Sequence, residues 1–496
     1  MSTADPLKDI ELLIRSRYAI IVVETDEEER AEALLGHVAD RLSIPLFSWT
    51  PTKGLKRAGR DGPVYGTTEP AKALAHIEAS GFPAIYHLRG LGPYLQDPVL
   101  GRSLVEAARP FAERDGVIVL TGTDLTLPEA ARPMSATVRL APPPIGEYRR
   151  LLAHILRDLG RKMQVHVDMT PEEVNRLLHA IKGLSLMEAE KLLTRVIVED
   201  GRLAPDDLQS VLAIKREIIE REGLLEYYPA EETLSDIAGL DGLKRWLAQR
   251  RAIITDPKKA AAFGLPFPKG ILLVGVPGCG KSLAAKAVAM EWGLPLLKLD
   301  PANLYNKYVG ESERNFKRAM QTAERMAPVV LWIDELEKAF ASAGDEDGGV
   351  SMRVLGSFLS WMQDRRGDVF VVATANDVTR LPPEFLRKGR FDEIFFVDLP
   401  GEEARRALFE IHLRRRNQAP ERFDLPALAR ATEGFSGAEV EQVIVSGLYS
   451  AFSAGTPLST AMLLEEAART RPLSRTMGER IHALRMWARD RTVSAD

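Results

Sequence analysis

The stretch Ile271–Ser282, ILLVGVPGCGKS, decides the fold of the C-terminal half of this 496-residue chain. Apolar residues with the character of a buried strand lead into Gly275. Gly280, Lys281 and Ser282 follow four residues later, and the helical stretch LAAKAVAMEW comes directly after them. This is the strand–loop–helix context that a phosphate-binding loop requires. The glycines let backbone N–H groups close around phosphates, and the helix N-terminus favours negative charge.

The loop predicts binding of ATP together with Mg²⁺. Lys281 is placed to reach the β- and γ-phosphates, and the Ser282 hydroxyl to coordinate Mg²⁺. A glycine turn without a ligand is the alternative, and the flanking strand and helix disfavour it. The residues expected to contact the nucleotide here are Gly275, Val276, Pro277, Gly278, Cys279, Gly280, Lys281, Ser282 and Leu283.

The composition is that of a soluble globular protein, with 45% hydrophobic and 27% charged residues. The net charge of −4 gives no broad basic surface for nucleic acid. Neither a signal peptide nor a membrane-spanning run is evident, so we expect a cytoplasmic protein. Cys279 is the only cysteine. Its place at a helix N-terminus could lower its pKa and make it a redox switch, although a small residue that simply fits the loop is the simpler interpretation.

A second acidic motif follows the apolar stretch Val329–Ile333. Asp334 and Glu335 come directly after this predicted strand, where buried carboxylates are costly unless they face a cation or a ligand. Ligands bind outside the carboxyl ends of parallel strands, so both acids should face the phosphate loop. We expect Asp334 to hold Mg²⁺ and Glu335 to polarise the attacking water; a solvated acidic loop is the alternative.

The next predicted strand, DVFVVATAND, carries Asn376 near its end, where an amide could orient that water. Arg387 and Arg390 follow around Gly389 and have no obvious path to their own phosphate site. They would make sense if they entered the site of a neighbouring copy and stabilised transition-state charge there. Otherwise two arginines in a loop are usually just solvated.

Together these motifs make the segment from about Leu234 to Ser450 resemble the AAA family of ATPases. The resemblance implies an α/β fold, a P-loop AAA+ module in which helices sandwich a parallel sheet and an α-helical lid follows. It rests on Asp236–Leu240, Gly275–Ser282, Leu331–Glu335, the region from Thr374 to Asp392, and Gly434–Ala438. The long N-terminal half and the stretch GGVSMRVLGSFLSWMQ resemble the plastid and bacterial AAA group known as a conserved plastid reading frame.

The resemblance also implies roles for individual residues and a hexameric ring of identical subunits. By similarity the adenine pocket includes Asp236 and Ala238, the lid contributes His412 and Ala438, Asn376 is the sensor, and Arg387 and Arg390 are arginine fingers. The run Lys307–Glu311 is similar to the first pore loop of ring translocases, in which Tyr308 and Val309 would grip an extended polypeptide. A packed aromatic residue is the alternative for Tyr308.

The first half matches the second element by element but lacks its chemistry. AIIVVETDEEER corresponds to the phosphate-loop segment, PAIYHLRG to the strand before Asp334, and GVIVLTGTD to the strand before Asn376. Carboxylates of Glu24–Glu29 stand where the loop should be, and Arg89 and Gly90 replace the two acids. Carboxylates repel a triphosphate. We therefore predict a degenerate, non-catalytic AAA-like module, with a generic α/β domain as the alternative.

These observations predict five segments: a degenerate module at 1–225, a linker at 226–233, the large ATPase subdomain at 234–402, a helical lid at 403–470 and a C-terminal helix or tail at 471–496. The favoured function is a ring ATPase that remodels an unknown protein partner. A nucleotide-dependent switch or scaffold with slow hydrolysis is a second hypothesis. A nucleic-acid motor is a third, which the acidic pI disfavours.

Overall fold

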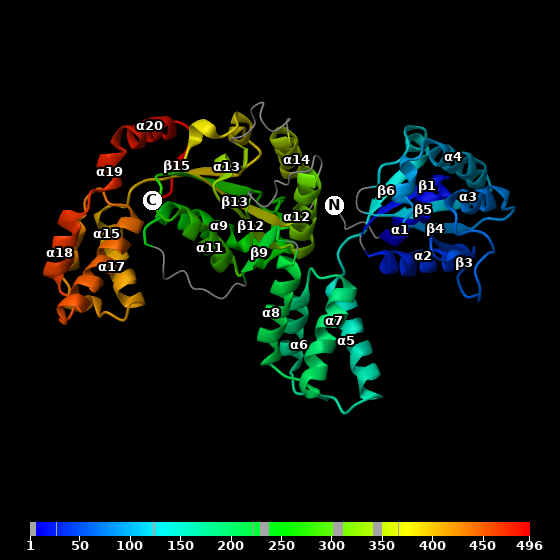
Figure 1. The fold of residues 1–496 in the computed structure, drawn as a ribbon, viewed down its shortest axis with the longest axis horizontal. Helices are drawn as coiled ribbons and strands as arrows, with labels where there is room; N and C mark the ends of the chain where they lie inside the picture. Colours follow the sequence, from blue (N-terminus) through cyan, green and yellow to red (C-terminus); the bar gives the residue numbers. More distant parts are fainter. Residues whose placement is uncertain are drawn as a thin grey trace. The chain divides into compact units, whose positions relative to one another are not determined.

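The computed structural model describes residues 6–25, 27–122, 125–221, 223–228, 238–300, 311–340, 350–365 and 367–496. The chain divides into two compact units, Met1–Pro142 and Pro143–Asp496. Each unit contains a mainly parallel β-sheet flanked by helices (Figure 1). Among the described residues, no helix combines the length and the apolar character needed to span a membrane.

The first unit is built on a six-stranded sheet of order β3-β2-β4-β5-β1-β6. Only the β2–β3 pair is antiparallel. The strands are β1 (Ile20–Glu24), β2 (Leu46–Thr50), β3 (Gly54–Arg57), β4 (Ile85–Arg89), β5 (Val117–Thr121) and β6 (Ser135–Arg139). The helices are α1 (Pro6–Arg15), α2 (Glu28–Leu42), α3 (Pro70–Ala79) and α4 (Pro98–Glu113), with short 3₁₀ turns η1 (Gly92–Gln96) and η2 (Glu129–Met134).

Helices cover both faces of this sheet, which is why its central strands are apolar throughout. Apolar residues of α1 and α2 pack with Ile21 and Val23 on one face. Residues of α3 and α4 pack with Ile20 and Val22 on the other. Parallel strands buried on both faces are expected to be nearly continuous hydrophobic runs. The first unit is therefore a three-layer α/β sandwich.

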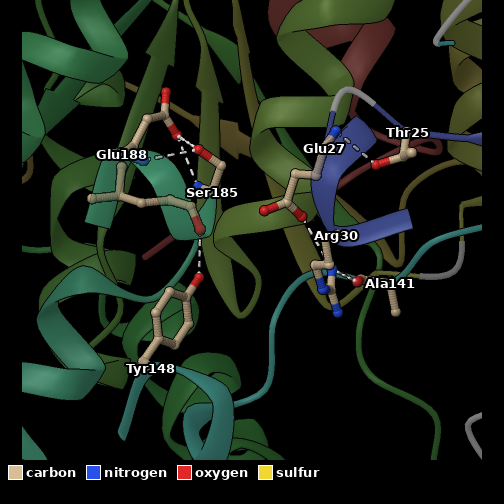
Figure 2. A network of polar contacts seen from close by, with 8 residues as sticks. Thr25, Glu27, Arg30, Ala141, Tyr148, Ser185 and Glu188 are labelled. Atoms are coloured by element: carbon tan, nitrogen blue, oxygen red, sulfur yellow. Dashed lines mark hydrogen bonds and ion pairs between the residues drawn. The ribbon is translucent and has the colours of Figure 1, made fainter. Parts of the chain in front are cut away.

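The second unit begins with a helical region that has its own core of apolar residues. Its elements are α5 (Ile145–Gly160), α6 (Pro171–Ile181), α7 (Leu186–Asp200) and α8 (Asp207–Glu220), with the two-residue strands β7 (His166–Val167) and β8 (Arg202–Leu203). Ser185 and Glu188 form a capping box at the start of α7, and the Tyr148 hydroxyl donates to the Leu184 carbonyl at 2.5 Å (Figure 2).

The main sheet of the second unit has the order β15-β14-β10-β13-β12-β11-β9. Its parallel core, β14-β10-β13-β12-β11, repeats the order β6-β1-β5-β4-β2 of the first unit, strand for strand along the chain. The strands are β9 (Leu225–Tyr228), β10 (Gly270–Gly275), β11 (Leu296–Leu299), β12 (Val329–Ile333), β13 (Val369–Ala375), β14 (Glu393–Val397) and β15 (Val493–Ser494).

Helices again cover both faces of this sheet. Apolar residues of α9 (Asp241–Thr255) and α11 (Lys281–Trp292) form one core with the sheet, and those of α12 (Glu311–Met326) and α14 (Val350–Asp364) another. The remaining elements here are α10 (Pro257–Ala262), α13 (Leu336–Phe340), η6 (Val378–Arg380) and η7 (Pro383–Leu386). The fold is thus the helix-flanked parallel sheet expected of a P-loop AAA+ module.

A separate helical core follows β14 and occupies the range predicted for the lid. Its elements are α15 (Glu402–Arg415), η8 (Pro420–Arg422), α16 (Leu425–Ala431), α17 (Gly437–Ala454) and α18 (Thr460–Arg469). The last segment of the chain, α19 (Leu473–Thr476), α20 (Gly478–Ala488) and β15, returns to the sheet, where β15 pairs with β14. Sequence reasoning expected only a helix or tail at 471–496.

The division between the two compact units differs from the predicted first boundary near residue 225. Residues after Pro142 join the second unit because β9 pairs antiparallel with β11, Leu225 opposite Leu299. Lys182 Nζ also donates to the Ala327 carbonyl at 2.6 Å. The predicted linker 226–233 starts inside β9, and residues 229–233 lie outside the described part of the chain.

Candidate nucleotide site

The phosphate loop connects β10 to α11, as the sequence predicts. Gly278 and Gly280 have φ values of +75° and +88°, which residues with a Cβ rarely adopt. Gly275 packs so closely on β14 that an added Cβ would lie 2.0 Å from the Val397 carbonyl oxygen. Glycine is therefore required at these three positions by backbone conformation or by space, and the loop can direct N–H groups toward an anion at the start of α11.

Lys281 is the first residue of α11 and is buried, with 5% of its surface exposed. Its ammonium donates to the carbonyls of Gly275 and Val276, at 2.9 and 2.7 Å. Burial lowers the pKa of Lys281 to about 8, so the side chain is mainly protonated at neutral pH. A cation held at the loop in this way is suited to triphosphate oxygens.

Asp334 directly follows β12 and lies opposite the phosphate loop. Its Oδ1 accepts hydrogen bonds from Ser282 Oγ at 3.3 Å and from Thr374 Oγ1 at 2.5 Å. Oxygen ligands from one hydroxyl and one carboxylate, completed by phosphates and water, are what Mg²⁺ usually takes in nucleotide sites. Ser282 and Asp334 therefore fit Mg²⁺. The hydrogen bond from Thr374 fixes the orientation of the Asp334 carboxylate.

Glu335 lies next to the sensor residue and to a lysine. Its Oε1 accepts from Asn376 Nδ2 at 3.3 Å, and its Oε2 pairs with Lys338 Nζ at 2.6 Å. The Asn376 backbone N–H donates to the buried carboxylate of Glu337 at 2.9 Å. Glu335 has a φ of +49°, a conformation that is uncommon for residues with a side chain and is often found at functional sites.

One cavity of about 440 Å³ is lined by Lys281, Ser282, Asp334, Glu335, Thr374 and Asn376. The phosphate end is formed by the loop, Asp334, Glu335 and Asn376. Away from the loop the cavity is lined by Ala238, Gly239, Leu240, Leu408, His412 and Asp496, of which Ala238 and His412 were predicted to contact the nucleotide. Ala438, also predicted, lines the cavity next to the loop. Because the loop would fix the phosphates, a nucleoside would extend toward Ala238 and His412, which we call the nucleoside end.

The lid reaches the phosphate loop through its own backbone. The Ala438 N–H donates to the Gly278 carbonyl at 3.1 Å, directly after the capping box of Ser436 and Glu439 that starts α17. His412 is buried, and burial lowers its pKa although its Nδ1 lies 3.6 Å from Glu441. A neutral His412 presents an uncharged ring to the nucleoside end of the cavity.

Comparison with known proteins decides the family. The model of the ATPase family associated with various cellular activities (AAA) matches residues 271–399. Models of the N-terminal and second domains of SpoVK-like AAA ATPases match residues 6–140 and 146–222. The AAA domain-containing protein ycf46 of Pyropia yezoensis is 36% identical over 488 residues, covering 97% of each chain. That of Guillardia theta is 35% identical over 97% of this chain and 94% of its own.

The chain belongs to the AAA family of ATPases. The resemblance drawn from its motifs is confirmed, down to the group of relatives that it indicated. Membership supports nucleotide binding and a general ATPase role, with Mg²⁺ as the typical metal ion. The two models that match the first 222 residues separate a domain ending near Pro142 from the helical region that follows.

The AAA chain has a shielded cysteine in its phosphate loop. Burial raises the pKa of Cys279 to about 12, and its Sγ lies 3.8 Å from the Pro277 carbonyl. The suggestion that the helix N-terminus lowers this pKa is therefore wrong, because loss of water outweighs both the helix and the nearby Lys281. A thiol that stays protonated is a poor redox switch, so the interpretation as a small loop residue holds.

The two arginines after the sensor are not among the residues that line the subunit's own cavity. Arg387 is exposed. Arg390 is half-buried and donates to the Leu359 carbonyl on α14. Their role as fingers in a neighbouring site stays a prediction. Asp236, Tyr308 and Val309 lie outside the described residues.

Several site residues were not assigned a role from the sequence. The Thr374 hydroxyl donates to Asp334, and the Glu337 carboxylate accepts from the Asn376 backbone N–H. Lys338 forms an ion pair with Glu335. Two features of the sequence could have indicated these residues. Thr374 lies near the end of its predicted strand, and Glu337 and Lys338 follow within four residues of Asp334. Asp398 and Asp496 also line the cavity, and nothing near them in the sequence marks them.

The corresponding edge of the first sheet holds ion pairs instead. Arg89, at the position of Asp334, pairs with Glu32 of α2 at 3.0 Å, and Glu24 pairs with Arg139 at 2.9 Å. Glu27 pairs with Arg30, which also donates to the Ala141 carbonyl (Figure 2). These carboxylates are neutralised by the unit's own arginines, so Arg30, Arg89 and Arg139 are already paired with acids at this edge.

Proposed function

We propose that this AAA chain hydrolyses ATP with Mg²⁺ and uses the reaction to remodel a protein partner. The observation that carries the hydrolysis is the convergence of a phosphate-loop lysine, a hydroxyl–carboxylate pair and a carboxylate–amide pair in one cavity. These are the parts that phosphoryl transfer to water requires: a phosphate cradle, ligands for a metal ion, and groups that orient the nucleophile.

Each residue has a distinct part in this proposal. The loop N–H groups and Lys281 would bind the phosphates, and Ser282 and Asp334 would hold Mg²⁺, which neutralises charge on the phosphates. Glu335 would accept a proton from the attacking water while Asn376 orients that water. Lys338 pairs with Glu335 Oε2 and would hold this carboxylate in place.

The ring and the protein partner extend the proposal beyond a single subunit. Arg387 is exposed and does not line its own subunit's cavity, which supports a role in trans and therefore a homo-oligomer, for which a hexamer is the family expectation. The net charge of −4 favours a protein partner over nucleic acid. A nucleotide-dependent switch remains the second candidate, supported by the ion-paired first unit.

The test is Glu335→Gln, which keeps the size of the side chain and removes its basicity. Turnover of ATP should fall by about 10²-fold or more, because a general base contributes roughly 10²–10⁴. ATP binding should persist, measured with a fluorescent analogue. Glu28→Gln at the corresponding edge of the first sheet is the matched control and should leave turnover unchanged. Normal turnover in the Glu335→Gln protein would reject the proposed mechanism.

Partner remodelling has its own test. Tyr308→Ala should abolish work on a protein substrate trapped by the Glu335→Gln protein while leaving basal ATP turnover within about twofold. A switch would keep its partner-dependent behaviour in the Tyr308→Ala variant. Stimulation of turnover by DNA or RNA with a steep salt dependence would favour the motor hypothesis instead.

A further inference from the structure

The segment from Leu473 to Asp496 contacts four separate segments in or next to the nucleotide site, although neither the motifs nor the matched family models include it. We call it the C-terminal strap. At its start, the Leu473 N–H donates to Glu439 Oε1 at 2.7 Å, and Glu439 belongs to the capping box of α17 beside the phosphate loop. The strap therefore begins on the lid.

Its helix α20 then meets the two loops at the carboxyl edge of the sheet. Arg480 Nη2 donates to Asp377 Oδ2 at 2.7 Å, and Asp377 directly follows the sensor Asn376. Arg485 forms three hydrogen bonds of 2.8–3.1 Å with the carboxylate of Asp398, a residue of the cavity wall. Pairing through several bonds fixes orientation as well as distance.

The Arg480–Asp377 pair is a polar contact between α20 and the predicted sensor loop, next to apolar packing of Leu484 and Val378 in one core cluster. A second cavity of about 290 Å³ lies between α20 and the loop, lined largely by apolar side chains such as Val378 and Ile481. Apolar packing therefore leaves part of this contact open, and the ion pair adds a directional bond there. Asp377 also accepts hydrogen bonds from the N–H and the hydroxyl of Thr379. Burial raises the pKa of Asp377, but the bonds from Thr379 together with the charge of Arg480 outweigh it, so the pKa is lowered.

The strap ends at the nucleoside end of the first cavity. Ala495 is fully buried; its N–H donates to the Phe396 carbonyl, and its carbonyl accepts from the Leu243 N–H, both at 3.0 Å. A Cβ on Gly242 would lie 2.8–3.1 Å from three carbonyl oxygens of this strand. Residue 242 of α9 therefore has to be glycine for the C-terminal strap to lie in place.

This placement brings the side-chain carboxylate of Asp496 to the predicted adenine pocket. Asp496 Oδ1 accepts from the Leu240 N–H at 2.8 Å, and Leu240 has a φ of +59°. A β-unbranched leucine in this conformation is strained, and the charged acceptor stabilises it at the N-terminus of α9. Asp496 thereby holds the wall formed by Ala238 and Gly239.

We propose that the C-terminal strap is a positioning element of the nucleotide site, in which Arg480 holds the sensor loop and Asp496 holds the nucleoside end. The proposal rests on the proposed ATPase function. It assigns two separable effects to one segment. Arg480 should act on kcat, because Asn376 orients the water, and Asp496 should act on KM, because its wall contacts only the bound nucleoside.

The first experiment measures steady-state ATP turnover of the full chain. Arg480→Gln should lower kcat about tenfold with KM unchanged, since a hydrogen bond to a charged group is lost. Arg480→Lys should restore part of kcat. Arg489→Gln, at the exposed C-cap of the same helix, is the matched control and should change neither constant. An unchanged kcat in Arg480→Gln, or an equal loss in Arg489→Gln, would overturn the role of Arg480.

The second experiment compares ATP with inorganic tripolyphosphate, which has phosphates but no nucleoside. Asp496→Ala should weaken ATP binding about tenfold and leave tripolyphosphate binding unchanged, whereas Asp496→Asn, which keeps an acceptor for the Leu240 N–H, should bind ATP nearly normally. Asp490→Ala, exposed in the same segment, is the control. Equal weakening of both ligands, or of neither, would overturn the role of Asp496. If the unaltered protein bound neither ligand, the proposed function itself would fail.

Discussion

The two sheets of this AAA chain share one strand order and carry opposite charges at the same edge. After β12 the second sheet presents Asp334, and its neighbouring loop supplies Lys281. In the first unit, Glu32 in the second turn of α2 pairs with Arg89 at the end of β4. An arginine, Arg89, thus occupies the position of Asp334, and its ion pair with Glu32 lies where the second sheet has the proposed Mg²⁺ ligands.

Details of backbone geometry strengthen the correspondence. Gly90 and Glu335 occupy equivalent positions after their strands and both have a positive φ, +71° and +49°. Thr121 pairs in register with Arg89, as Thr374 lies beside Asp334. The comparison shows that this fold is maintained by apolar burial on both sheet faces and does not depend on nucleotide chemistry at the edge.

The largest expected difference between the two edges is in nucleotide binding. Lys281→Ala should reduce ATP turnover by about 10²–10³-fold or more, because it removes the buried cation that faces the phosphates. Arg89→Ala at the first edge should leave ATP binding unchanged. Steady-state turnover of the Lys281→Ala protein checks the first expectation. Titration of the Arg89→Ala protein with a fluorescent ATP analogue checks the second. If Arg89→Ala abolished binding, the first edge would have to be a second nucleotide site.

The arginine after the predicted sensor gives an effect of comparable size, on kcat and not on binding. Arg387→Ala should lower kcat about 10³-fold, the range expected for an arginine finger, while ATP binding persists. Arg132, an exposed residue within η2 of the first unit, is the control, and Arg132→Ala should leave kcat unchanged. Mixing Arg387→Ala with Glu335→Gln subunits should restore some turnover if the finger acts in trans. Full turnover by a monomeric Arg387→Ala protein would contradict the ring.

The pH dependence of binding sharpens the electrostatic comparison. The pKa of Lys281 is lowered to about 8, so the ammonium form is present below that pH and is lost above it. ATP affinity should therefore be flat from about pH 6.5 to 7.5 and should fall up to tenfold per pH unit above about 8. Calorimetry across this range measures it. Arginine replacement, Lys281→Arg, should remove the fall, and a fall that persisted would assign it to another group.

The smallest effect concerns the stability of the first unit. Arg89→Leu leaves Glu32 half-buried without its partner and should lower the local free energy of unfolding by about 1 kcal/mol. Hydrogen exchange over β4 in the full chain measures this change, and Arg102→Leu, whose partner Glu106 is exposed, is the control. Equal protection in both variants would show that the ion pair contributes nothing to the edge.

Sequence reasoning located the nucleotide site because its chemistry is written in short local motifs. The phosphate loop, the two acids after β12 and Asn376 each follow a recognisable apolar strand, and parallel strands bring their carboxyl ends to one edge. The same reasoning missed Glu337, whose role as acceptor for Asn376 depends on the turn after Asp334. For Cys279 it favoured a small loop residue over a redox switch, but the direction of its pKa shift depends on burial by surrounding residues.

The sequence by itself determined the family, the element-by-element correspondence of the two halves and the loss of phosphate-binding groups from the first. These properties follow from hydrophobic periodicity and from residues adjacent along the chain. Only the tertiary structure decided that the first compact unit ends at Pro142, that Arg89 is paired with Glu32, and that Asp496 reaches the cavity beside Leu240. Those contacts join residues as many as 256 positions apart, and local patterns carry no information about which distant groups the packed sheet brings together.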